Sequence, residues 1–107
     1  MSDTEVKVKK PPRVKVVSRN EIAPPKMFKV IFLNDDATTV EFVVECLTTI
    51  FDHTIEVAVE LTEKIHLEGS AVVGVFPYEI AEHKGVEITM AARTSGFPLE
   101  VKIEPDE

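Results

Sequence analysis

The sequence predicts a small α+β domain in which three short strands form one sheet and three helices pack against it. Two observations carry this prediction. β-branched and aromatic residues gather in three short segments, and apolar residues recur at helical spacing in three longer ones. In chain order these segments give βααβαβ, which fits one small sheet with helices packed on a face. The 107 residues are enough for one domain with a modest core.

The first strand is expected over residues 26–33, KMFKVIFL, which are rich in Phe, Val and Ile. The first helix is expected from about Thr39 to Phe51, where the apolar residues keep helical spacing. Thr38 and Glu41 fit a capping box. In that arrangement the Thr38 hydroxyl accepts a hydrogen bond from a first-turn N–H and Glu41 reaches back to the cap.

The second helix is expected to follow a turn at residues 52–54. It begins at Ile55 and ends near Gly69, because glycine is favoured just past a helix end. The second strand is expected over residues 71–76, AVVGVF.

The third helix is expected to carry Pro77 in its first turn and to stop before Gly96. Gly85 inside it should weaken the helix by about 1 kcal/mol relative to Ala. Beyond Gly96, Leu99, Val101 and Ile103 alternate with charged residues, which indicates a half-buried third strand.

The charge is divided unevenly along the chain. Residues 1–26 hold seven Lys and Arg against three Asp and Glu, about +4, and residues 27–107 hold five against sixteen, about −11. Residues 1–23 are therefore predicted to be a flexible basic extension, and residues 24–107 the folded domain. An acidic body argues against nucleic acid as a partner. It would suit a cationic ligand, although solubility alone also accounts for it.

The composition also indicates where the protein works and argues against catalysis. No apolar run approaches the roughly 20 residues of a membrane span, and no signal peptide is evident. The single Cys46 suits a reducing cytosol, so a cytoplasmic location is expected. There is no HExxH, GxSxG or glycine-rich phosphate motif. The chain is thus predicted to be no enzyme and to need neither metal nor cofactor.

Asn34, Asp35 and Asp36 stand where the first strand meets the first helix, and two interpretations stay open. Short polar side chains end strands and favour helix starts, or their oxygens bind a ligand. His66 lies four residues after Thr62, on the same helical face. It too has two interpretations, a favourable partner of the helix dipole or a ligand contact.

The segment PPKMFKVIFLNDDATTVEFVVECL resembles the ClpS adaptor family, the N-degron recognition adaptors of the bacterial Clp protease. The resemblance continues through IHLEGSAVVGVFPYEIAEHK and PLEVKIE and spans about residues 24–104. It implies a three-stranded antiparallel sheet with three helices, like the C-terminal domain of a ribosomal stalk protein. It also implies that the chain is a monomeric adaptor. Such adaptors bind proteins with a bulky apolar first residue and pass them to the N-terminal domain of a ClpA-type AAA+ unfoldase for degradation by ClpP.

The resemblance assigns roles residue by residue. Asn34, Asp35 and His66 match the ligands of the substrate's α-amino group, and Asp36 is assigned more to the turn and the helix start. Glu79 and Lys84 match the surface that docks on the unfoldase. The hydrophobic pocket is expected to be lined by Thr38, Val40, Val43, Thr62, Ile65 and Leu99.

Two pocket positions depart from well-known members, which have Met where this chain has Val40 and Thr62. A shorter gate at Val40 is expected to admit β-branched first residues. The Thr62 hydroxyl needs a partner, for which the carbonyl one turn back is suited. The alternative function is a docking module of stalk-like fold that binds a large protein through its helix faces without reading N-termini.

Overall fold

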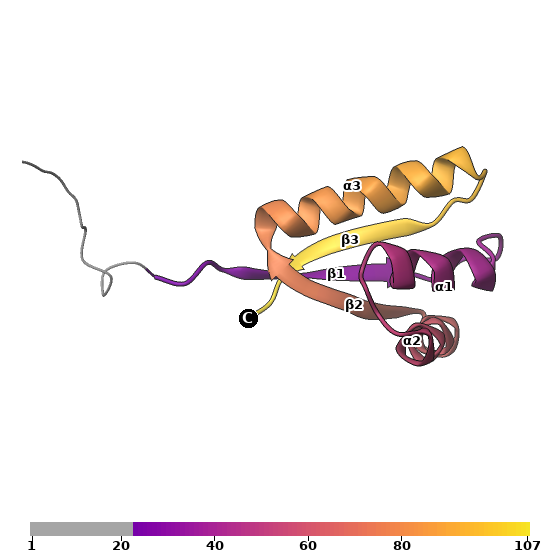
Figure 1. The fold of residues 1–107 in the computed structure, drawn as a ribbon, viewed down its shortest axis with the longest axis horizontal. Helices are drawn as coiled ribbons and strands as arrows, with labels where there is room; N and C mark the ends of the chain where they lie inside the picture. The colour runs from indigo at the N-terminus through magenta and orange to yellow at the C-terminus, as the bar shows by residue number, and fades with distance from the viewer. Residues whose placement is uncertain (1–22) are drawn as a thin grey trace, which may run out of the picture.

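The computed structural model describes residues 23–107, so the predicted basic extension lies outside the described residues except for Ala23. The α+β fold is confirmed, with three strands in one antiparallel sheet and three helices (Figure 1). In chain order the elements are β1 (Met27–Leu33), α1 (Val40–Thr49), α2 (Ile55–Glu68), β2 (Ser70–Pro77), α3 (Tyr78–Thr94) and β3 (Glu100–Pro105).

The first strand, β1, lies in the centre of the sheet, between β2 and β3 and antiparallel to both. Its Val30 and Phe32 are fully buried, whereas Ile31 between them is half-buried, so one face of the sheet carries the core. Figure 1 shows α3 running along the sheet, with α1 and α2 toward the end at which β1 finishes. The connection between β1 and α1 therefore lies at the same end of the molecule as these two helices.

A β-bulge interrupts the pairing of β1 with β2. Val30 pairs with Gly74 and the next residue, Ile31, pairs with Val72, which leaves Val73 as the extra residue. A Cβ at Gly74 would lie 2.5 Å from Cε2 of Phe76, so any other residue there would have to displace that ring. The carbonyl oxygen of Val73 lies within hydrogen-bonding distance of Nε2 of His53, at 2.6 Å.

The start of α1 corrects one prediction. The N-cap is Thr39, whose hydroxyl accepts a hydrogen bond from the Phe42 N–H at 3.2 Å, and not Thr38. The Thr38 hydroxyl is occupied elsewhere, because it donates to the Asp35 carboxylate. The helix also ends at Thr49, two residues earlier than predicted.

The other helix ends agree more closely with the sequence. Thr54 caps α2 through the Val57 N–H, and Gly69 ends it in the left-handed conformation, φ 91°. Pro77 precedes α3 as its cap and does not stand in its first turn. Gly85 is buried, and a Cβ there would lie 3.2 Å from Cδ1 of Ile103. Whatever helix propensity it costs, this glycine lets α3 lie close to β3.

Cys46 is one of the core residues, with 3% of its surface exposed. Burial, aided by the negative charges of Glu45 and Glu87, raises the pKa of its thiol to about 11. The thiol therefore stays protonated near neutral pH and is a poor nucleophile. Within residues 23–107, no helix is long and apolar enough to cross a membrane.

Candidate functional site

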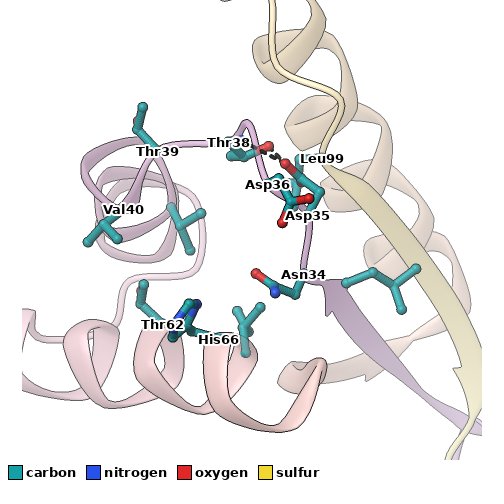
Figure 2. A pocket seen from close by; sticks show the side chains of 12 residues that line it. Asn34, Asp35, Asp36, Thr38, Thr39, Val40, Thr62, His66 and Leu99 are labelled. Carbon is teal, nitrogen blue, oxygen red and sulfur yellow. Dashed lines mark hydrogen bonds between the residues drawn. The ribbon is translucent and has the colours of Figure 1, made fainter.

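A pocket of about 300 Å³ opens where the end of β1, the start of α1, the later turns of α2 and the segment before β3 meet (Figure 2). All nine residues predicted to bind the α-amino group or to form the hydrophobic pocket line it. Its full lining is Leu33, Asn34, Asp35, Asp36, Thr38, Thr39, Val40, Val43, Thr62, Ile65, His66 and Leu99. Three separate stretches of the chain, residues 33–43, residues 62–66 and Leu99, thus contribute to one cavity.

The turn between β1 and α1 is held by the Asp35 carboxylate. Its Oδ1 accepts hydrogen bonds from the backbone N–H groups of Ala37 at 2.8 Å and Thr38 at 2.7 Å. Its Oδ2 accepts one from the Thr38 hydroxyl at 2.8 Å, drawn dashed in Figure 2. Asp35 therefore sets the shape of the rim that carries Asn34, Asp36 and Thr38.

Opposing effects act on the ionisation of Asp35. Its burial favours the neutral form, but the hydrogen bonds from Thr38 and Ala37 and the positive charge of Arg93 outweigh it. The pKa of Asp35 is consequently below its usual value of 3.8. The rim carries a fixed negative charge near neutral pH.

We expect Thr38→Val to lower the free energy of unfolding by about 1 kcal/mol at pH 7, because it removes one donor to the Asp35 carboxylate. The low pKa of Asp35 stabilises the fold above its unfolded pKa, and that stabilisation is lost as the pH falls through the folded pKa. The deficit of the variant should therefore shrink below pH 3.8. Urea unfolding at several pH values measures it.

The matched control is Thr49→Val, whose hydroxyl donates to the uncharged carbonyl of Glu45 at 2.7 Å. Its effect should not change between pH 7 and acid. A pH-independent deficit for Thr38→Val would contradict the stabilising role of the ionised Asp35 carboxylate.

Two further polar groups face the pocket from opposite sides. The Asn34 backbone N–H donates to the Gly69 carbonyl at 2.9 Å, which joins the end of β1 to the end of α2. In Figure 2 the Asn34 side chain points toward α2, from which His66 reaches into the same space. Both residues are exposed, so their polar atoms are available to a ligand from solvent.

Asp36 lies on the same rim, and the structure changes its assignment. The turn is held by Asp35, while among residues 23–107 no hydrogen bond reaches the carboxylate of Asp36. Asp36 is exposed and lines the pocket. Its oxygens are thus additional acceptors at the mouth.

The inner wall of the pocket is apolar and its mouth is open. Leu99, 1% exposed, lies deep, and Val43 and Ile65 are also buried. Val40, in contrast, is 62% exposed and lies at the mouth. The Thr62 hydroxyl donates to the Ala58 carbonyl at 2.7 Å, one turn back, as predicted, so its methyl group can face the pocket at no polar cost.

The two residues assigned to unfoldase docking lie outside this pocket and differ in their surroundings. Glu79 is exposed in the first turn of α3. Lys84 is half-buried, and its Nζ donates to the Ile50 carbonyl at 2.7 Å. The same ammonium lies 5.5 Å and 5.3 Å from the ring centroids of Phe51 and Phe76. Lys84 therefore fastens the end of α1 to α3, a contact that the sequence did not indicate.

Sequence reasoning missed Leu33 and Thr39 as pocket residues. Leu33 is the last residue of β1, and Thr39 is the N-cap of α1. The signal in the sequence that could have indicated them is their position: Leu33 directly precedes Asn34, and Thr39 directly follows Thr38.

Comparisons with known proteins point to one family. The family model described as ATP-dependent Clp protease adaptor protein ClpS matches residues 23–102. An ATP-dependent Clp protease adapter protein ClpS from Nautilia profundicola is 46% identical over 94 residues, 88% of this chain and 97% of that relative. One from Campylobacter jejuni is 39% identical over 95 residues, 89% of this chain and 99% of that relative.

A solved structure agrees with these relatives. Agrobacterium tumefaciens ClpS2 bound to L-phenylalaninamide superposes with a TM-score of 0.75 at 40% sequence identity. The match covers 78% of this chain and all of that one.

Proposed function

Because the chain belongs to the ClpS family of ATP-dependent Clp protease adaptors, we propose that it binds proteins through a free, bulky apolar first residue. We further propose that it delivers them to the N-terminal domain of a ClpA-type AAA+ unfoldase for degradation by ClpP. One observation carries the first part: a single small pocket combines an apolar inner wall with a rim of amide, carboxylate and imidazole groups.

The rim suits a protonated α-amino group. A free α-amino group has a pKa of about 7.7–8.0 and is mostly cationic at pH 7. It presents several donors, whereas an internal peptide N–H presents one. Asn34, His66 and the two carboxylates offer acceptors and negative charge at the mouth. These groups favour the start of a chain over any internal position.

The cavity suits one side chain. Its volume of about 300 Å³ is at the lower end of ligand pockets, so it has room for a single residue and not for a longer segment. Burying one large apolar side chain contributes about 1.5–3 kcal/mol, and a charge-assisted hydrogen bond contributes about 1.5–3 kcal/mol. Only the two together give useful affinity, which makes the first residue with its amine the recognised unit.

The related A. tumefaciens protein supports this proposal by its ligand. L-phenylalaninamide has a free α-amino group, a benzyl side chain and an amide in place of the following peptide bond. It therefore has the chemical groups of a chain that starts with Phe. At 40% identity the two proteins are close enough for the ligand chemistry to be tested directly on this chain.

A panel of peptides that differ only in residue one tests the proposal. We expect Phe, Tyr, Trp and Leu to bind, and Ile and Val to be tolerated, because Val40 leaves the mouth open. Replacing Val40 and Thr62 with Met should lower the affinity for Ile and Val relative to Phe. Fluorescence anisotropy with each labelled peptide measures this, and equal affinity for Phe-, Asp- and Gly-initiated peptides would contradict it.

The alternative, a docking module that does not read N-termini, has one observation in its favour. Ile80, Val86 and Met90 on α3 are about half exposed or more, and such side chains can form a contact surface. A docking surface on α3 and an α-amino site can coexist, so only the peptide measurements separate the two functions.

A further inference from the structure

A short segment of backbone carries Leu99 to the inner wall of the pocket. It leaves α3 at Ser95 and turns through Gly96, whose φ of 81° is left-handed. The Phe97 N–H donates back to the Ala92 carbonyl at 2.8 Å, which closes the helix end in the manner of a Schellman motif. Leu99 follows Pro98 and precedes β3, so no strand pairing holds it.

Arg93 supplies a second hold on this segment. Its Nη1 donates to the Phe97 carbonyl at 2.9 Å and to the Leu99 carbonyl at 3.0 Å. One guanidinium nitrogen thus joins the backbone on both sides of Pro98. We call Arg93 and these two carbonyls the Arg93 clamp.

The clamp is also placed next to the rim of the pocket. The positive charge of Arg93 is one of the influences that keep the Asp35 carboxylate ionised. The Phe97 ring packs edge-to-face on Phe42 of α1, with ring centroids 5.2 Å apart. The segment that bears Leu99 is therefore tied to α3 by Arg93 and to α1 by Phe97.

We propose that Arg93 is a positioning residue that sets selectivity for large first residues by fixing Leu99 in the inner wall of the pocket. This inference rests on the proposed function. Leu99 is buried in the inner wall and Val40 is exposed at the mouth, so we expect a large first side chain to reach Leu99 and a small one to stay beside Val40. Loss of the clamp should therefore weaken the binding of peptides with a large first residue more than the binding of peptides with a small one.

The test compares Arg93→Met, which removes both donors and the charge, with Arg93→Lys, which keeps the charge. Arg93→Met should bind a Phe-initiated peptide about tenfold more weakly, which is the effect of one methylene group in an apolar pocket. Its affinity for a Val-initiated peptide should stay nearly unchanged. Arg93→Lys should not restore the ratio of Phe to Val affinity. Its ammonium, on a shorter and unbranched stem, does not reproduce the two hydrogen bonds of one guanidinium nitrogen. Lys102→Met is the matched control for charge and should leave the ratio unchanged.

Two binding results would overturn the inference: an equal loss of affinity for Phe- and Val-initiated peptides in Arg93→Met, or full recovery of the ratio of Phe to Val affinity in Arg93→Lys. Methyl NMR of Leu99 in the ligand-free protein tests the clamp without any peptide. We expect its signals to shift and broaden in Arg93→Met, and unchanged signals would also overturn the inference. If the unaltered protein bound no peptide at all, the proposed function would fail, while the NMR comparison would still decide on the clamp.

Discussion

Asp35→Ala is expected to abolish binding of Phe-initiated peptides, with a loss in affinity of about 100-fold or more. Removing a charge-assisted acceptor costs about 1.5–3 kcal/mol. The same carboxylate holds the turn through Ala37 and Thr38, so its loss also releases the rim that positions Asn34. The two effects act on one site and should combine. Anisotropy with a labelled peptide measures the loss, and circular dichroism checks that the variant is folded.

A matched pair of isosteric changes separates charge from fold. Asp35→Asn keeps an oxygen for the backbone N–H groups of Ala37 and Thr38 but removes the charge. Asp52→Asn makes the same change outside the pocket, at a residue whose φ of 60° asparagine tolerates. Asp35→Asn should lower the affinity for the peptide at least about tenfold, and Asp52→Asn should leave that affinity unchanged. Full peptide affinity in a folded Asp35→Ala variant would favour the alternative docking module.

Lys84→Met is expected to lower the free energy of unfolding by roughly 1.5–3 kcal/mol. The substitution leaves the Ile50 carbonyl without its charged donor and removes the cation from the rings of Phe51 and Phe76. Urea denaturation followed by circular dichroism measures this. A variant as stable as the original would contradict the structural role of Lys84.

Glu79→Lys is the companion variant, because Glu79 is exposed on the same helix. Its stability should change by less than about 0.5 kcal/mol. If both residues belong to the proposed unfoldase-docking surface, both variants should weaken binding to the unfoldase's N-terminal domain at a temperature where each is folded. Weakened binding in Lys84→Met alone would assign its effect to the displaced end of α1 and not to docking.

The sequence was sufficient for the order of the elements, because the relevant signals are local. Gly69 marks the end of α2 through the chemistry of capping, as expected, whereas Thr54, expected only in the preceding turn, caps its start in the structure. Thr38 and Thr39 show where local signals stop. Both are threonines ahead of the same helix, and the competing carboxylate of Asp35 decides which one caps it.

Other features depend on contacts between distant segments. Lys84 reaches Ile50 across 34 positions, and the bulge at Val73 lies in the pairing of β2 with the distant strand β1. No periodicity encodes either. The pocket is a mixed case: helical spacing marked Val43 and Ile65 only as core, and the family resemblance assigned them to a binding wall. In the structure each of the two side chains is buried in the core and also lines the cavity.

We propose that the rim of the pocket recognises a free, charged α-amino group. Titrating the protein with one Phe-initiated peptide, once with a free N-terminus and once acetylated, tests this recognition. Acetylation removes the charge and all but one of the donors while leaving the benzyl side chain intact. We predict that the acetylated peptide binds at least about tenfold more weakly, the loss of one charge-assisted bond. Equal affinity for the two peptides would contradict recognition of the α-amino group.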